Sequence, residues 1–253
     1  MNYELDAGAG RGLQLGLIVL STDETLEYEA RRGLAGREAN LLHTRIPAQA
    51  EVTPEDLATM AARMTESARL LPQGLDAVAY GCTSGATVIG PDRVAALIRE
   101  AHPGVPVTDP MSAVIKALRA LEARRIAMVT PYVEAVTHPM RAHMADHGIE
   151  TVRALNFGES TDRTVARITE RSTERAILEA GAEGGVDAVF VSCTNLRSFG
   201  IIETAEARLG LPVISSNSAL MWHLLGLAGQ DGTGWGPGQL YAIRPPAPEE
   251  MRP

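Results

Sequence analysis

The sequence has little cysteine, few aromatic residues and no excess of positive charge. Two cysteines in 253 residues cannot build a disulfide framework, which favours a reducing cytoplasm. With 23 Lys and Arg against 31 Asp and Glu, the net charge of −8 argues against the basic surface that nucleic acids require. No apolar run approaches the ~20 residues of a membrane-spanning helix. We therefore expect a cytoplasmic globular protein with neither nucleic-acid nor membrane partners.

Several common catalytic motifs are also missing. The chain has no G-x-x-x-x-G-K-[ST] phosphate loop, no G-x-S-x-G nucleophile elbow and no H-E-x-x-H zinc helix. No G-x-G-x-x-G follows the first predicted strand, so a dinucleotide cofactor is not indicated. We expect chemistry that uses ordinary side chains, with no metal and no cofactor.

Short apolar runs rich in β-branched residues alternate with longer helical patterns along the chain. Alternation of this kind predicts parallel sheets covered by helices, an α/β fold. The longer helices are predicted over residues 53–71, 137–147 and 162–182. The strands are predicted at residues 13–20, 41–46, 76–81, 105–108, 125–130, 149–156, 186–192 and 211–215.

An internal repeat indicates two similar halves. Residues 76–83 (DAVAYGCT) align with residues 187–194 (DAVFVSCT), with five identical positions of eight. At the same spacing of 111 residues, the strand at 126–130 aligns with the strand at 15–19. A general likeness among α/β units does not explain why Cys-Thr recurs at the same strand end. We therefore expect two α/β halves rather than one continuous sheet.

Both cysteines, Cys82 and Cys193, are predicted at the carboxyl end of a strand, directly before a turn into a helix. Ligands of open α/β sheets bind outside these strand ends. The positive end of a following helix lowers the pKa of a thiol, and free backbone N–H groups beside it hold carboxylates. For one cysteine alone, burial as a small hydrophobic residue is the simpler interpretation. Two in equivalent positions favour a functional pair.

Two thiols on opposite sides of one small molecule permit two kinds of isomerisation. In the first, one thiolate removes a proton while the other thiol returns a proton on the opposite face, which inverts a stereocentre. In the second, one thiolate adds to an activated double bond, the adduct rotates, and elimination gives the other geometric isomer. A third interpretation, from another class, is a non-catalytic protein that binds a small acid in the same crevice.

These residues resemble the aspartate/glutamate racemase superfamily, and within it the maleate cis–trans isomerases and arylmalonate decarboxylases. The resemblance is carried by the loops at residues 82–84 and 192–197 and by the strand at 16–19, and covers about residues 13–228. It implies two pseudo-symmetric lobes, each a four-stranded parallel sheet flanked by helices, with the active site in the cleft between them. The first lobe would comprise residues 1–113 and 221–253, with a returning C-terminal helix, and the second residues 114–220.

The resemblance also implies roles for individual residues. Cys82 and Cys193 match the catalytic pair, and the presence of both argues against a simple decarboxylase, since arylmalonate decarboxylases keep only the second. Tyr132 matches a tyrosine that contacts substrate in maleate isomerases. The residues that match loops holding a substrate carboxylate are Thr83, Ser84, Thr194 and Asn195.

Two positions depart from the maleate isomerase pattern. Asp23 and Asp162 align with asparagines that contact substrate in that family. An asparagine amide donates a hydrogen bond to a carboxylate, whereas an ionised aspartate repels it and attracts a cation. We therefore predict a substrate that carries a positive group, such as an ammonium. The alternative is that either aspartate merely caps a helix.

The segment at residues 16–27 further resembles the racemase-like proteins of bacterial ectoine utilisation. That likeness implies a substrate derived from 2,4-diaminobutyrate, a carboxylate with one or two amines. The expected partner is thus a small carboxylate substrate, and we also expect a homo-oligomer, either a dimer or a tetramer.

Overall fold

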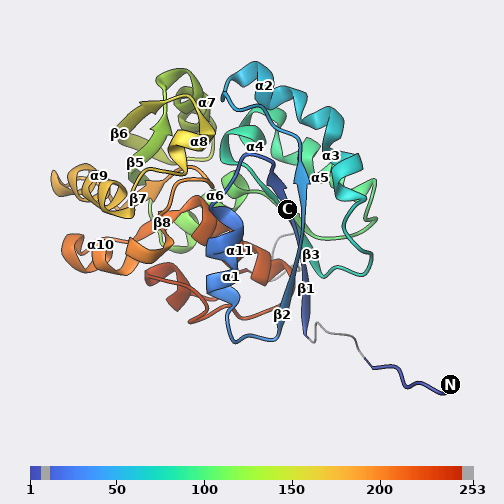
Figure 1. Cartoon of the computed structure of the whole chain (residues 1–253). Coiled ribbons are helices and arrows are strands. Elements are labelled where there is room, and N and C mark those ends of the chain that lie inside the picture. The colour runs from blue at the N-terminus through green and yellow to red at the C-terminus, as the bar shows by residue number, and fades with distance from the viewer. Residues whose placement is uncertain (7–11, 247–253) are drawn as a thin grey trace.

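The computed structural model describes residues 1–6 and 12–246 and contains two four-stranded parallel sheets (Figure 1). Two segments of the predicted first lobe, residues 7–11 and 247–253, lie outside the described residues. The first sheet has the strand order β2-β1-β3-β4 and the second β6-β5-β7-β8, so the two halves share one topology. The strands are β1 (Leu13–Leu20), β2 (Ala39–Ile46), β3 (Ala77–Gly81), β4 (Val107–Thr108), β5 (Arg125–Tyr132), β6 (Glu150–Glu159), β7 (Ala188–Val191) and β8 (Val213–Ser215).

Helices follow almost every strand, as the alternation in the sequence predicts. None of the helices in the described part of the chain has the length and apolar character needed to cross a membrane. The helices are α1 (Leu26–Leu34), α2 (Pro54–Thr59), α3 (Ala61–Ala68), α4 (Thr83–Ile89), α5 (Pro91–Arg99), α6 (Pro110–Ala120), α7 (Glu134–Asp146), α8 (Asp162–Val165), α9 (Glu170–Ala182), α10 (Ile202–Leu209) and α11 (Ser216–Leu227), with short 3-10 turns η1 (Phe199–Ile201) and η2 (Gln239–Ala242).

The two longest predicted helices are each broken in the structure. The first is divided into α2 and α3 at Met60, whose N–H turns back to the carbonyl groups of Leu57 and Ala58. The second is divided into α8 and α9, because the Thr169 hydroxyl accepts the N–H of Ser172 and so caps a new helix. The helix predicted from residue 137 begins three residues earlier, at Glu134.

Helix α11 is the central element of the fold. All of its residues are buried, and it packs against α6 and α1 and against strands of both sheets, β3 and β8 (Figure 1). A helix that is apolar on every side is expected in such an interior position. Its amino end, at Ser216, follows β8 directly and lies among the loops that carry the two cysteines. The packing of α11 therefore fixes the halves of the site relative to each other.

Candidate active site

One buried cavity brings together all nine residues singled out in the sequence. They come from the carboxyl ends of β1, β3, β5 and β7 and from the start of α8, segments up to 172 positions apart in the chain. Both cysteines line this cavity, as expected for equivalent positions in two facing halves. The lining residues are Leu20, Asp23, Cys82, Thr83, Ser84, Tyr132, Asp162, Cys193, Thr194 and Asn195.

The cavity is closed. Its free volume is about 10 Å³, which is close to the room that one water molecule needs. Every lining residue is buried, and Cys82 and Cys193 are each 4% exposed. A small organic acid therefore enters only when the surrounding loops separate.

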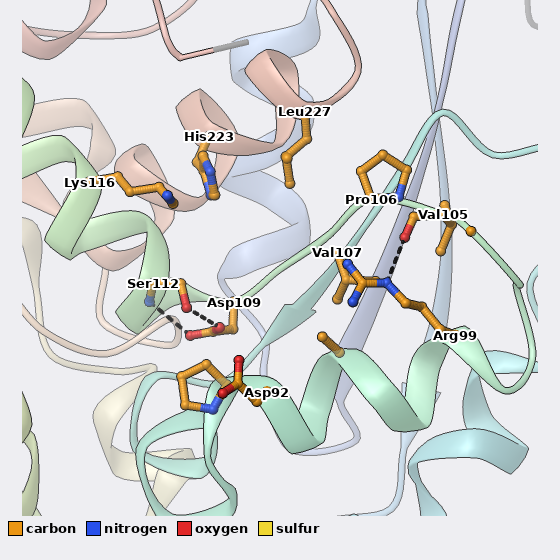
Figure 2. A pocket seen from close by; sticks show the side chains of 13 residues that line it. Asp92, Arg99, Val105, Pro106, Val107, Asp109, Ser112, Lys116, His223 and Leu227 are labelled. Carbon is orange, nitrogen blue, oxygen red and sulfur yellow. Dashed lines mark hydrogen bonds between the residues drawn. The ribbon is translucent and has the colours of Figure 1, made fainter. Parts of the chain in front are cut away.

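Larger cavities lie elsewhere and hold neither cysteine. One of about 480 Å³ opens between α5, α6 and α11 (Figure 2). The side chains of Lys116 and His223 face it, together with Asp109, whose carboxylate caps α6. This cavity is larger than the one that holds the cysteines, but it contains neither of them, so the paired thiols favour the smaller cavity as the active site.

Cys82 caps the amino end of α4. Its sulfur accepts the N–H of Gly85 at 3.2 Å and lies 3.7 Å from the hydroxyl oxygen of Ser84. The expectation of a lowered pKa is nevertheless wrong. Complete burial raises the pKa of the Cys82 thiol to about 12, more than the helix N–H and the hydroxyl lower it.

Cys193 has a different environment, and no helix follows it directly. The chain runs through a loop to η1, contrary to the expectation from the sequence. Its backbone has a φ of 116°, a conformation that costs energy for any residue with a Cβ. Burial and the nearby Asp162 carboxylate raise the pKa of the Cys193 thiol well above its usual value, although its sulfur accepts the N–H of Asn195 at 3.3 Å.

Tyr132 and Asp162 form a hydrogen-bonded chain to Cys193. The hydroxyl of Tyr132 donates to Oδ1 of Asp162 at 3.0 Å and lies 3.1 Å from Cys193 Sγ. The hydroxyl of Thr22 donates to the other carboxylate oxygen of Asp162 at 2.6 Å. Burial raises the pKa of Asp162.

Asp23 does cap a helix, but with only one of its oxygens. Oδ1 accepts the N–H groups of Thr25 and Leu26 at the start of α1, both at 2.8 Å. Oδ2 is buried and accepts no hydrogen bond of good geometry. The Thr194 hydroxyl is close enough to lower the pKa of Asp23, but it donates to the Gly81 carbonyl oxygen at 3.3 Å. Burial raises the pKa of Asp23 to about 6, against the lowering effect of the two N–H groups. The residues that line the cavity include no Lys or Arg to balance this carboxylate.

The hydroxyl and amide side chains expected to hold a substrate carboxylate are engaged within the protein. Thr83 donates to Ser216 Oγ at 2.8 Å, and Thr194 donates to the Gly81 carbonyl oxygen at 3.3 Å. Asn195 donates to the carbonyl oxygen of Asp162 at 3.0 Å, and its own side-chain oxygen accepts the N–H of Glu24. These side chains therefore fix the loops around the cavity.

Three residues that support the site were not found in the sequence. Oγ of Ser216 accepts the N–H of Cys193 at 3.0 Å. The buried carboxylate of Glu29, in α1, accepts the N–H groups of Ser198 and Phe199 and the side-chain amide of Asn217. The polar run at residues 215–218, placed between a strand and an otherwise apolar helix, is the one signal that could have indicated Ser216 and Asn217, and no such signal marks Glu29.

Comparison with known proteins identifies relatives over most of the chain. The arylmalonate decarboxylase family matches residues 38–241. The arylmalonate decarboxylase of Bordetella bronchiseptica is 32% identical over 183 residues, which are 70% of this chain and 76% of that protein. The maleate isomerase of Nocardia farcinica is 30% identical over 229 residues, 84% of this chain and 88% of that protein.

Solved structures share the fold. The N. farcinica maleate cis–trans isomerase bound to TRIS has a TM-score of 0.80 and 26% identity, covering 90% of this chain and 97% of that one. A cysteine-to-serine variant of that isomerase carries a covalently bound succinylcysteine intermediate. Its TM-score is 0.79 with 24% identity, and it covers 90% of this chain and 98% of that one. The predicted α/β fold of two four-stranded parallel sheets is thus confirmed.

Proposed function

The chain belongs to the arylmalonate decarboxylase family, whose members include enzymes with cysteine-based catalysis, and we propose that it is a cofactor-independent isomerase that inverts a stereocentre beside the carboxylate of a small amine-bearing acid. The observation that carries this proposal is the cavity itself. It is lined by two cysteines and by Asp23, one of whose carboxylate oxygens is buried without a hydrogen-bond partner. Membership of the family supports an isomerase, and the residues that line the cavity support an amine-bearing acid as the substrate.

Cys82 and Cys193 act as a proton acceptor and a proton donor on opposite faces of the substrate. The thiolate of one cysteine takes the proton from the carbon beside the carboxylate, and the electron pair of the broken C–H bond moves into the carboxylate as an enediolate. The thiol of the other cysteine then gives its proton to the opposite face of that carbon. After one turnover the first cysteine is a thiol and the second a thiolate, so the enzyme is set for the reverse direction.

Asp23 is the receptor for the positive group of the substrate. Its Oδ2 is buried without a hydrogen-bond donor, which costs stability unless a donor or cation arrives. An ammonium supplies both charge and three N–H donors. Asp162 fits this role less well, because its two oxygens already accept from Thr22 and Tyr132. The substrate must carry both a carboxylate and an ammonium group. Examples are aspartate and the two ectoine-related substrates, 2,4-diaminobutyrate and its acetylated forms.

The substrate carboxylate binds to the backbone N–H groups of Thr83, Ser84 and Thr194. The N–H groups of Gly85 and Asn195 already donate to the two cysteine sulfurs, and that of Cys193 donates to Ser216. The first N–H groups of α4 have no acceptor within their own helix. The hydroxyls of Thr83 and Thr194 are already engaged, so we assign the carboxylate to the backbone rather than to these side chains.

The test is proton exchange in deuterated water, followed by NMR. The panel contains both enantiomers of aspartate, 2,4-diaminobutyrate and its two monoacetyl forms, together with maleate. We expect deuterium at the carbon beside the carboxylate for at least one amine-bearing acid, and no inversion by the Cys82→Ala or Cys193→Ala variants, each of which keeps a base on one face only. Absence of exchange for all amine-bearing acids would overturn the proposal.

A second candidate function is cis–trans isomerisation of a maleate-like diacid through a thioether adduct. One observation favours it, the covalent succinylcysteine found in the N. farcinica enzyme of the same fold. The two aspartates argue against it, because a diacid would bring two more negative charges into a cavity that has no cationic side chain. Conversion of maleate to fumarate, with a succinyl mass added to one cysteine, would establish this function instead.

A further inference from the structure

A continuous chain of hydrogen bonds joins Asp162 to Cys193 inside the cavity. Tyr132 Oη donates to Asp162 Oδ1 at 3.0 Å and lies 3.1 Å from Cys193 Sγ. A phenol has one proton, and here it is given to Asp162. The proton between Tyr132 and Cys193 is therefore that of the thiol, which donates to the phenol oxygen. In this arrangement Cys193 is a thiol and Asp162 is a carboxylate.

The surroundings of Asp162 are unusual for an ionised carboxylate. It is 2% exposed, and none of the residues that line the cavity is a Lys or Arg. Neutral groups hold it instead: Thr22 donates to its Oδ2, and Asn195 donates to its main-chain oxygen. Because burial without a cation raises the pKa of Asp162, this carboxylate accepts a proton more readily than a surface aspartate does.

We propose that Asp162 is the internal proton acceptor for Cys193, reached through Tyr132. In one concerted step the thiol proton passes to the oxygen of Tyr132 while the Tyr132 proton passes to Oδ1 of Asp162. The S–H bond of Cys193 and the O–H bond of Tyr132 break, and new O–H bonds form on Tyr132 and Asp162. The products are a Cys193 thiolate, an unchanged phenol and a neutral carboxylic acid.

Charge conservation explains why this route is preferred over loss of the proton to water. A thiolate formed by loss to solvent would be a second negative charge beside Asp162, and that repulsion contributes to the raised pKa of Cys193. Transfer to Asp162 instead leaves the chain of Cys193, Tyr132 and Asp162 with one negative charge before and after the step, so the total charge of the cavity does not change. The desolvation penalty of an additional buried charge is thereby avoided.

This inference rests on the proposed function, in which Cys193 must act as a thiolate for one direction of the reaction. The other ionisable groups that face the chain are Cys82, after β3, and Asp23, after β1. Glu24, next to Asp23 in the chain, and Arg167 form a solvent-exposed ion pair with each other at 2.7 Å. Because burial raises the pKa of Asp23 to about 6, most Asp23 side chains are already ionised at pH 7 and their charge changes little up to pH 9.

The experiment measures the rate at which iodoacetamide alkylates Cys193, by mass spectrometry, between pH 7 and pH 9. All proteins carry Cys82→Ser so that one thiol is followed. Only the thiolate reacts. If the thiol lost its proton to water, the rate would rise about tenfold per pH unit over this range. If the proton moves to Asp162 within the protein, the thiolate fraction does not depend on the pH of the solvent, and the rate stays constant within about twofold.

Two further substitutions define the route. Asp162→Asn removes the acceptor, and Tyr132→Phe interrupts the chain while leaving the carboxylate in place. We expect each of them to restore the tenfold rise per pH unit. Tyr132→Phe also keeps the test valid if Asp162→Asn fails to fold, which thermal melting will show. The rate must be proportional to the iodoacetamide concentration, because a rate limited by opening of the cavity would not be.

A tenfold rise per pH unit with Asp162 and Tyr132 intact would overturn the inference, and so would a constant rate that survives both substitutions. The measurement needs no substrate, which separates it from the proposed function. A constant alkylation rate together with no proton exchange on any amine-bearing acid would retain the proton chain and reject the substrate class.

Discussion

The Thr83 hydroxyl donates a 2.8 Å hydrogen bond to Oγ of Ser216, and this contact connects the loops of the two cysteines. Thr83 follows Cys82 directly, and the same Ser216 oxygen accepts the N–H of Cys193 at 3.0 Å. One oxygen atom at the start of α11 thus positions the backbone on both sides of the cavity. The spacing of the two sulfurs depends on this atom.

Replacing Ser216 by Ala should impair catalysis more than stability. The substitution leaves the buried N–H of Cys193 without an acceptor, which costs about 1–3 kcal/mol, and it releases a loop whose φ of 116° is strained. A displacement of about 1 Å can lower the rate ~100-fold. Urea unfolding and kcat would be measured. The matched variant Thr83→Val removes only the Thr83 bond, and an equal loss of kcat in both would contradict a role of Ser216 at Cys193.

Asp23→Asn should make the protein more stable at pH 8 and weaken its binding of amine-bearing acids. The pKa of Asp23 rises from 3.8 to about 6 on folding. The stability that this group contributes is present below pH 3.8 and is lost as the pH rises through 6, so at pH 8 its buried charge is unfavourable by up to about 3 kcal/mol. The new buried N–H₂ offsets part of the gain, and we expect about 1–2 kcal/mol in urea unfolding.

The same titration predicts the pH dependence of substrate binding. Below pH 6 Asp23 is a neutral acid and no longer attracts an ammonium, so KM for an amine-bearing acid should rise as the pH falls from 7 to 5. The Asp23→Asn variant should show a high KM with no such dependence. An identical pH profile of KM in both proteins would show that Asp23 does not receive the cation.

Glu29 should be required to hold the Cys193 loop in place. Its Oε1 accepts the N–H groups of Ser198 and Phe199 at 2.8 and 2.9 Å, and its Oε2 accepts the amide of Asn217 at 2.7 Å. Glu29→Ala leaves these buried donors unpaired, and we expect a loss of at least about 3 kcal/mol. Glu29→Gln retains the acceptor oxygen for the two N–H groups but sets an N–H₂ against the amide of Asn217, so it should lose less stability than Glu29→Ala without matching wild type. Similar melting temperatures for Glu29→Ala and wild type would contradict this role.

Gly85→Ala should lower activity by displacing the sulfur of Cys82. A Cβ at Gly85 would lie 2.6 Å from Tyr80 Oη and 2.9 Å from Cys82 Sγ. Gly181→Ala is a suitable control because it creates a similar crowding, 2.9 Å from a side-chain carbon of Leu209, outside the cavity. We expect both variants to lose stability, by about 1–3 kcal/mol, but only Gly85→Ala to lose kcat. Full activity of Gly85→Ala would show that the position of Cys82 is not critical.

The fold and the pair of cysteines follow from local patterns and from the repeat, whereas Asp23, Tyr132 and Asp162 are predicted from the family resemblance. Strand β1 has the predicted bounds, and the alignment of residues 76–83 with 187–194 places Cys82 and Cys193 after the equivalent strands β3 and β7. In parallel sheets the carboxyl ends of strands lie at one edge. Asp23 and Tyr132 therefore reach the same cavity as the cysteines.

The ionisation of the thiols and the supporting contacts could not be predicted in the same way. A helix end lowers the pKa of Cys82 locally, but the larger effect is burial, which arises only when both halves close over it. The bonds of Ser216 to Thr83 and of Glu29 to Asn217 join residues 133 and 188 positions apart. No periodicity or motif in a single sequence relates positions at such a distance.

The most direct measurement of the central claim follows each enantiomer of 2,4-diaminobutyrate separately in deuterated water by NMR. If Cys82 and Cys193 act on opposite faces, the first product molecules carry deuterium beside the carboxylate, while the remaining substrate is still protonated. Cys82→Ala and Cys193→Ala should each lower the rate of inversion by at least about 100-fold. Deuterium that enters the remaining substrate as fast as the product, or inversion that persists in either variant, would contradict a pair of cysteines acting from opposite sides.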